Sequence, residues 1–256
     1  MNLNGKISLV TGGAGGIGRA ICEKLAGLGS FVYICDIKKA EEVAQRINAG
    51  YQEVRASAAP CDIADRAAVE SLYARIGQEK GGVDILVNNA AVYGPLADHH
   101  FPHLSHEDFI KTIQVDLSGA MYCTLLALPR MMREGWGRIL FTAAPMSSSG
   151  IPSPYLAGKA GFMGLTKYLS RRYGEDGIFT FALALRHVDT PMIRKVMKSR
   201  GHDPASAVKS LHEESLTGRM ITPEEIADIY AHVICTAPPG LNGMVIPADG
   251  GITYLR

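Results

Sequence analysis

A glycine-rich turn near the N-terminus has the spacing that holds a pyrophosphate. In V-T-G-G-A-G-G-I-G at residues 10–18, Gly13, Gly15 and Gly18 match G-x-G-x-x-G, between an apolar run at 6–11 and a helical pattern at 17–29. Glycines allow a tight turn and a close approach to phosphate, and the start of a helix offers free N–H groups and a positive dipole end. This context favours a dinucleotide site at 12–18 over a strand–helix turn without a ligand.

The end of the second predicted strand indicates which dinucleotide would bind. Asp36 closes the apolar run 31–36 and lies 18 residues after Gly18. A carboxylate at this place accepts hydrogen bonds from the adenosine ribose hydroxyls and repels a 2′-phosphate. The sequence therefore favours NAD over NADP, although Lys38 and Lys39 leave some NADP tolerance open. The alternative interpretation of Asp36 is an ordinary aspartate in a turn.

A tyrosine and a lysine lie four residues apart in a later helical pattern. Tyr155 and Lys159 open the predicted helix 154–173 and share one of its faces. A nearby ammonium, together with the positive charge of an oxidised nicotinamide, favours tyrosinate and lowers the phenol pKa from about 10. Such a pair could move a proton, but the spacing is common by chance, so its meaning depends on the elements around it.

Apolar runs alternate with helical patterns along the whole chain. Strands are expected at residues 6–11, 31–36, 52–61, 84–88, 138–143, 178–185 and 243–247. Helices are expected at residues 17–29, 40–49, 65–79, 105–134, 154–173 and 223–236. This alternation predicts an α/β protein with a single-domain Rossmann fold over residues 1–256: a doubly wound parallel sheet of about seven strands with helices on both faces. The polar segment 190–217 interrupts the alternation and is expected to form a substrate lid.

The ordered motifs resemble the classical short-chain dehydrogenase/reductase family over essentially the whole chain. The family's T-G-x-x-x-G-x-G turn matches residues 11–18. Further matches are C-D-I at 61–63, N-N-A-A at 88–91, Y-L-A-G-K at 155–159, T-P-M at 190–192 and D-G-G at 249–251. Each piece alone is weakly specific, but their joint order is typical of this family.

The resemblance implies hydride transfer between NAD and a secondary alcohol or ketone. It makes Tyr155 the general acid/base, and Lys159 would also bind the nicotinamide ribose. Asp62 would contact adenine, and Asn89 would line the nicotinamide side. The cofactor-binding residues it implies are Gly12, Gly15, Gly16, Ile17, Gly18, Asp36, Asp62, Ile63, Asn89, Ala90, Tyr155, Lys159, Val188 and Thr190. It also implies a homo-oligomer, either a tetramer or a dimer.

The strand-end serine that polarises the substrate carbonyl in this family is missing. Counting forward from Gly137 places Ala144 at that position, whereas counting back from Tyr155 places Thr142 there. We favour the forward count, because loop lengths vary more than strand lengths. Loss of one such donor can cost roughly 10²–10³ in rate.

Two more positions depart from the family pattern. Asp116 stands where the family has a helix asparagine whose backbone holds a water in a proton relay to the lysine. A negative charge there would change the electrostatics of Lys159. Arg186-His187 replaces the Pro-Gly that borders nicotinamide and substrate after the sixth strand. We nevertheless include Asp116 among the catalytic residues.

Several nearby residues could complete the site. Ser147 is the preferred substitute donor, ahead of Ser148 and Ser149, and His187 could donate as well. Ala144, His187 and Tyr93 are expected to border the substrate, although Tyr93 could equally be a packed loop aromatic. The alternatives to a dehydrogenase are an NAD-binding protein with eroded activity and a non-redox, epimerase-type enzyme that uses the same site.

Four histidines between residues 98 and 106 raise the question of a metal site. A zinc site needs three or four converging ligands, no cysteine lies nearby, and Pro102 breaks a regular helix here. We therefore expect no metal and interpret the segment as a loop beside the substrate cleft. The histidines concerned are His99, His100, His103 and His106.

Composition and charge exclude several partner classes. The formal net charge is +1, so no basic patch predicts nucleic-acid binding. No apolar run of about 18 residues predicts a membrane span. The 5 cysteines are widely spaced without a C-x-x-C pair, which favours reduced thiols in a cytoplasmic protein.

Overall fold

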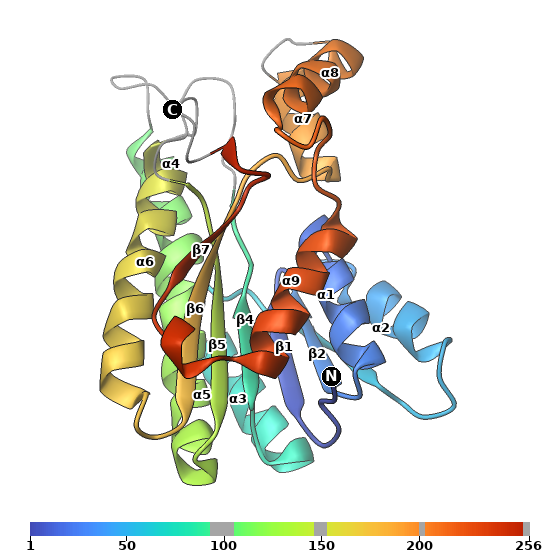
Figure 1. Ribbon diagram of the computed structural model, residues 1–256. Coiled ribbons are helices and arrows are strands. Elements are labelled where there is room, and N and C mark those ends of the chain that lie inside the picture. The colour runs from blue at the N-terminus through green and yellow to red at the C-terminus, as the bar shows by residue number, and fades with distance from the viewer. Residues whose placement is uncertain (93–104, 146–152, 200–202, 253–256) are drawn as a thin grey trace.

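Seven parallel strands form one sheet in the computed structural model, which describes residues 1–92, 105–145, 153–199 and 203–252 (Figure 1). The strand order is β3-β2-β1-β4-β5-β6-β7. The chain starts at the centre of the sheet, moves outward to β3, and then crosses to β4 and on to β7. The strands are β1 (Ile7–Thr11), β2 (Phe31–Asp36), β3 (Ala56–Pro60), β4 (Ile85–Asn88), β5 (Gly137–Ala143), β6 (Ile178–Leu185) and β7 (Val245–Ala248). The predicted doubly wound Rossmann fold is confirmed.

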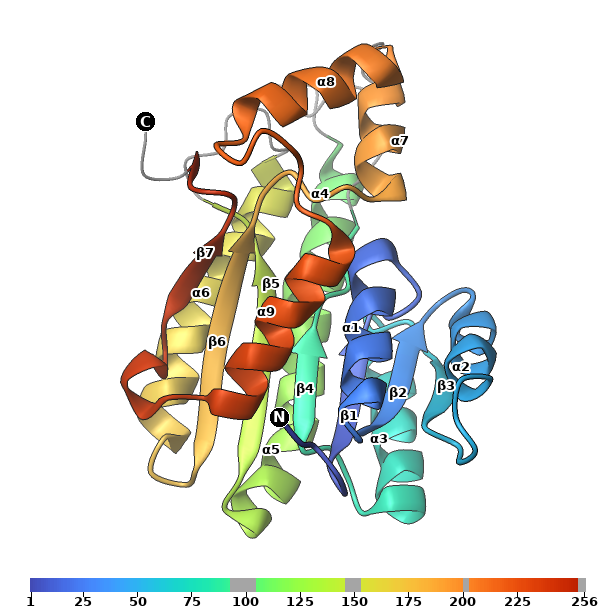
Figure 2. The same cartoon turned by 45° about the vertical axis from the view of Figure 1, so that its right-hand side comes forward.

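Helices cover both faces of the sheet (Figures 1 and 2). One face carries α1 (Gly16–Gly27), α2 (Ala40–Asn48) and α9 (Pro223–Thr236). The other face carries α3 (Arg66–Lys80), α5 (Ala120–Glu134) and α6 (Ser153–Tyr173). Each face has its own apolar core, which explains why the strands read as nearly continuous apolar runs.

The helix expected over residues 105–134 contains a local irregularity. It consists of α4 (His106–Ile113), a π-helical stretch η1 (Gln114–Gly119) and then α5. The wider turns of η1 bury Asp116 and Gly119. Such π segments frequently occur at functional sites, and apolar periodicity did not reveal this one.

Two of the predicted strand segments begin two or more residues before the strand itself. The segment 52–61 contains the third strand, and β3 occupies Ala56–Pro60 within it. Just before and at its first residue, the side-chain oxygen of Asn48 accepts the N–H groups of Arg55 and Ala56 at 2.9 Å each. The last strand starts at Val245, because Gly243 has a φ of +83°, which no strand residue adopts.

The segment at residues 190–217 is largely helical. It holds α7 (Pro191–Ser199) and α8 (Pro204–Glu214), which lie beyond the carboxyl ends of the strands (Figure 2). A parallel bridge between Val188 and Ile221 joins the two ends of this segment. Its bonds run from Asp189 N–H to the Ile221 carbonyl at 2.9 Å and from Ile221 N–H to the His187 carbonyl at 3.2 Å. Among the described residues, no helix has the length and hydropathy needed to cross a membrane.

Candidate active site

Two adjoining hollows lie where the chain changes direction between β1 and β4. This switch point, at the carboxyl ends of the strands, is where ligands bind in open α/β sheets. The larger one, the Tyr155 hollow, is lined by Gly12, Gly15, Gly16, Ile17, Gly18, Asp36, Asn89, Ala90, Ala91, Thr142, Tyr155, Lys159, Thr190 and Met192. The second one, the Asp62 hollow, is lined by Gly12, Cys35, Asp36, Ile37, Cys61, Asp62, Ile63, Ala90, Ala91, Val92 and Val115.

The glycine turn has the close packing expected of a phosphate cradle. Gly12 has a φ of +62°, and a Cβ on it would lie 2.8 Å from the Cα of Ala90. A Cβ on Gly18 would collide with the Gly12 carbonyl oxygen. Among the described residues, no side chain caps the N-terminus of α1, so the first N–H groups of the helix remain available to an anion.

Asp36 is tied to the same turn. One carboxylate oxygen accepts the N–H of Ala14 at 3.1 Å, and the other accepts the N–H of Lys38 at 3.1 Å. These bonds hold the carboxylate at the rim shared by both hollows. A ribose placed between the hollows would therefore meet a fixed negative charge.

Asn89 joins the end of β4 to the end of β1. Its side-chain N–H₂ donates to the carbonyls of Thr11 and Gly12 at 3.1 and 3.2 Å. The Thr11 hydroxyl in turn accepts the N–H groups of Asn89 and Ala90 at 3.0 and 3.1 Å. These reciprocal bonds fix the wall of the Tyr155 hollow against the glycine turn.

Tyr155 and Lys159 lie together on α6, as their spacing predicts. The Lys159 ammonium is 5.3 Å from the centre of the Tyr155 ring and 4.9 Å from that of Phe162. Lys159 is fully buried, and its Nζ has no hydrogen-bond partner within the described part of the chain. Burial lowers the pKa of Lys159, and the charge of Asp116 acts in the opposite direction.

Asp116 reaches the same buried region from η1. One of its oxygens accepts the N–H of Val92 at 2.7 Å, while the other has no partner among the residues that the structure describes. A Cβ built on Gly158, next to Lys159, would lie only 3.0 Å from the Asp116 Cβ. Burial raises the pKa of Asp116 to about 6, although Lys159 and the Val92 N–H act against the rise. Buried charges with unmet hydrogen bonds are typical of functional sites.

The end of β5 carries no available hydroxyl. Ala144 is a buried alanine directly after the strand. The Thr142 hydroxyl donates to the side-chain oxygen of Asn89 at 3.2 Å and lies 2.7 Å from the Tyr230 hydroxyl. A threonine has one hydroxyl proton, and here it is used in the hydrogen bond to the Asn89 oxygen. Thr142 is therefore a poor donor to a substrate carbonyl.

The turn after β6 has an unusual backbone. His187 has a φ of +51°, and its Nε2 accepts the Nε–H of Arg186 at 2.9 Å.

Among cofactor candidates, Thr190 lies against the glycine turn, since a Cβ on Gly16 would be 3.0 Å from its methyl group. Val188, Ala144 and His187 do not line either hollow as the structure describes them.

Some predicted site residues lie outside the described residues. These are Ser147, Ser148, Ser149 and Tyr93, together with His99, His100 and His103. Their proposed roles stay predictions. His106 is the first residue of α4. Among the described residues, no group of three or more His, Cys, Asp or Glu side chains has a geometry suited to a metal ion.

The hollows also include residues outside the cofactor-binding set predicted from the sequence. Ala91, Thr142 and Met192 line the Tyr155 hollow, and Cys35, Ile37 and Val115 line the Asp62 hollow. Ala91 and Met192 belong to the N-N-A-A and T-P-M motifs, and Thr142 is the position reached by the backward count from Tyr155. Cys35 and Ile37 flank Asp36, so these signals were available. Val115 had no such signal except its neighbour Asp116.

Known proteins resemble this chain over nearly its whole length. A family model described as enoyl-(acyl carrier protein) reductase matches residues 12–253. D-beta-hydroxybutyrate dehydrogenase of Cupriavidus necator is 30% identical over 256 residues, 97% of this chain and 98% of that protein. Cis-4-hydroxycyclohexanecarboxylate dehydrogenase of Sinomonas cyclohexanicum is 32% identical over 252 residues, 97% of this chain and 96% of that protein.

The fold of the chain also closely matches that of a solved structure. The crystal structure of levodione reductase superposes with a TM-score of 0.93 at 26% identity and covers 100% of both chains. The family match spans the glycine turn, the Tyr155–Lys159 pair and the T-P-M and D-G-G motifs in one stretch. This chain therefore belongs to the short-chain dehydrogenase/reductase family and is an oxidoreductase.

Proposed function

We propose that this protein is an NAD-dependent oxidoreductase that interconverts a secondary alcohol and a ketone. The observation that carries the proposal is that one hollow contains the glycine turn, Asp36 and the Tyr155–Lys159 pair together. A dinucleotide bound at the turn would therefore extend toward a group that can carry a proton. Relatives of the chain include dehydrogenases named for a hydroxybutyrate and a hydroxycyclohexanecarboxylate, which is in keeping with an alcohol substrate.

The residues present fit such a cofactor along its length. The N–H groups at the start of α1 would hold the pyrophosphate, and Asp36 would accept the adenosine ribose hydroxyls. The Asp62 hollow, with Ile63 in its wall, would take adenine, and Asn89 and Thr190 would border the nicotinamide side. When bound, NAD supplies the hydride acceptor for oxidation and the donor for reduction.

The proton chemistry belongs to this chain's own residues. In the oxidation direction, the phenolate form of Tyr155, which the Lys159 charge stabilises, takes the proton of the substrate hydroxyl and becomes the neutral phenol. Asp116 adds a buried negative charge behind Lys159. Ser147 would donate a hydrogen bond to the substrate oxygen. Ala144, His187 and Tyr93 would border the substrate, under a lid at residues 190–217 of a single domain.

We also expect a homo-oligomer, a tetramer or a dimer, as is common in the family. Met121, Leu125 and Met132 on α5 are large apolar side chains that are exposed in the monomer. Their burial between copies of the chain would support that expectation.

One observation favours a second candidate function. Ala144 removes the usual carbonyl-polarising hydroxyl and Asp116 alters the charge beside Lys159, whereas the glycine turn is intact. This pattern fits an NAD-binding protein with eroded dehydrogenase activity. A non-redox reaction of the epimerase type at the same site is a further alternative.

A screen for NAD⁺ reduction over secondary alcohols and sugars tests the proposal directly. We expect NADH to accumulate with at least one substrate class, together with measurable NADH binding. Binding of NADH without reduction by any substrate would instead favour the eroded, binding-only function. Racemisation or elimination without net NADH formation would favour the non-redox alternative.

Replacing Asp36 by asparagine should weaken the preference for NADH over NADPH by about tenfold. Asparagine can still accept the Ala14 N–H, but it no longer repels a 2′-phosphate, and a charged hydrogen-bond partner contributes about 1.5–3 kcal/mol. The ratio of the two dissociation constants, measured by fluorescence titration, gives the result. An unchanged ratio would show that Asp36 does not select the cofactor.

Replacing Asp116 by asparagine should move the pH profile of activity to lower pH by about 1 unit. Loss of a negative charge makes neighbouring acids easier to deprotonate, so the limbs governed by Tyr155 and Lys159 both move down. The effect should vanish well below pH 6, where the Asp116 carboxyl is already protonated. Val92 donates a backbone N–H to this carboxyl, and Lys159 is the cation that faces it. Comparing kcat/KM against pH in the wild type and the variant measures the effect of the Asp116 charge. An unchanged pH profile would show that the Asp116 charge does not influence the groups that carry out the reaction.

A further inference from the structure

A chain of hydrogen bonds connects α9 to the glycine turn. The Tyr230 hydroxyl lies 2.7 Å from the Thr142 hydroxyl, which lies 3.2 Å from the side-chain oxygen of Asn89. The side-chain nitrogen of Asn89 then reaches the carbonyls of Thr11 and Gly12. Side chains from α9, β5 and the residue after β4 are thus linked to the backbone of the cofactor turn.

The direction of every bond in this chain is determined. The Asn89 nitrogen is identified because it faces two carbonyl oxygens, so the Asn89 oxygen faces Thr142. An amide oxygen only accepts, and therefore Thr142 donates its single proton to it. Tyr230 must then be the donor to Thr142. Neither hydroxyl can reverse without breaking a bond to Asn89.

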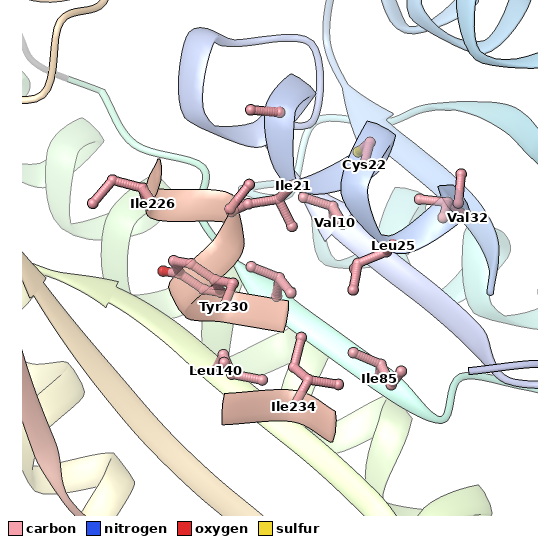
Figure 3. Packing of buried hydrophobic residues seen from close by; sticks show 14 of the residues in the cluster. Val10, Ile21, Cys22, Leu25, Val32, Ile85, Leu140, Ile226, Tyr230 and Ile234 are labelled. Carbon is pink, nitrogen blue, oxygen red and sulfur yellow. The ribbon is translucent and has the colours of Figure 1, made fainter. Parts of the chain in front are cut away.

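The first donor of the chain is isolated from solvent. Tyr230 is fully buried on α9 among apolar side chains that include Leu140, Ile226 and Ile234 (Figure 3). Burial raises the pKa of Tyr230, which keeps its hydroxyl protonated as a donor. The hydrogen-bond chain ends at the Tyr155 hollow, because both Thr142 and Asn89 line this proposed cofactor site.

We propose that Tyr230 is a positioning residue for the cofactor: acting through Thr142, it fixes the orientation of the Asn89 amide that forms the nicotinamide side of the site. The inference rests on the proposed function, because it requires a nicotinamide dinucleotide in the Tyr155 hollow. Tyr230 touches neither cofactor nor substrate in this role. Its effect should be confined to ligands that reach Asn89.

Two nucleotide probes separate positioning from general stability. NADH would occupy both hollows, whereas AMP would need the Asp62 hollow, the Asp36 rim and the phosphate-binding start of α1, but not the nicotinamide side at Asn89. Tyr230→Phe, which keeps the ring and removes the hydroxyl, should raise the dissociation constant of NADH about fivefold, the effect of one lost hydrogen bond, and leave that of AMP unchanged. Isothermal titration calorimetry with each nucleotide measures both values.

The chain offers matched control variants. Tyr73 on α3 is also buried, and its hydroxyl has no partner among the described residues, so Tyr73→Phe should leave NADH affinity unchanged. Thr142→Val removes the central hydroxyl with little change of shape and should weaken NADH binding at least as much as Tyr230→Phe. Thr142→Ser, which keeps the hydroxyl, should bind NADH more tightly than Thr142→Val. Thermal melts would verify that each variant is folded.

Several outcomes would overturn the inference. If Tyr230→Phe and Thr142→Val are folded and bind NADH as tightly as the wild type, the hydrogen-bond chain does not position Asn89. If they weaken NADH and AMP equally, the role of Tyr230 is structural only. A wild-type protein that binds neither nucleotide would overturn the proposed function itself, and this inference with it.

Discussion

Replacing Tyr155 by phenylalanine should lower turnover by about 10²–10⁴-fold, the usual contribution of a general acid/base. Affinity for NADH should stay within a few-fold of the wild type. The phenol is the group of the Tyr155 hollow that lies beside the buried Lys159 ammonium, at 5.3 Å from ring centre to Nζ. Phenylalanine fills the same space but cannot exchange a proton with the substrate.

A matched variant on the same helix controls for tyrosine loss as such. Tyr173 is the last residue of α6, at the far end from the hollow, so Tyr173→Phe should retain wild-type turnover. Steady-state kcat and NADH affinity, measured for both variants on the best substrate of the alcohol screen, test the expectation. Turnover that persists in Tyr155→Phe would remove Tyr155 as the proton carrier.

Replacing Ser147 by alanine should lower turnover by about 10²–10³-fold, as expected for loss of one hydrogen bond to a developing oxyanion. The described end of β5 makes this expectation specific. Ala144 has no hydroxyl, and the hydroxyl proton of Thr142 is already donated to Asn89. In the proposed function the carbonyl-polarising donor therefore comes from elsewhere, and Ser147 follows Ala144 by only 3 residues.

A second substitution provides the control. Ser147→Ala combined with Ala144→Ser should recover most of the lost turnover, because it returns a hydroxyl to the position usual in the family. Ser148→Ala should stay close to wild type. If Ser147→Ala has full activity and Ala144→Ser alone raises turnover, the protein is a weakened dehydrogenase without a substitute donor.

The regular strands and helices could be predicted from the sequence because each has its own pattern of residue types. Phe31–Asp36 is a run of side chains buried from both faces, and it appears as a strand with those bounds. Pro223–Thr236 was recognisable by its proline at the first turn, and the structure adds a capping box between Thr222 and Glu225. The pairing of Tyr155 with Lys159 followed from helical spacing alone.

The irregular parts of the fold could not be predicted from such patterns. The π segment at Gln114–Gly119 has no distinctive composition, and it packs against the loop after β3. A Cβ on Gly119 would lie 2.7 Å from the Ile63 side chain, which shows how close that contact is. The helical content of residues 190–217 was likewise hidden by their polarity.

Residue types at short, fixed spacings were enough to predict the strands, the regular helices, the glycine turn and the family. What surrounds each site residue, in contrast, depends on the packed fold. It engaged Thr142 with Asn89 and Tyr230, which are 53 and 88 residues away from it, and it buried Asp116 beside Lys159. Hydrogen-bond satisfaction and pKa values depend on burial and on partners distant in sequence, and only the packed sheet brings those together.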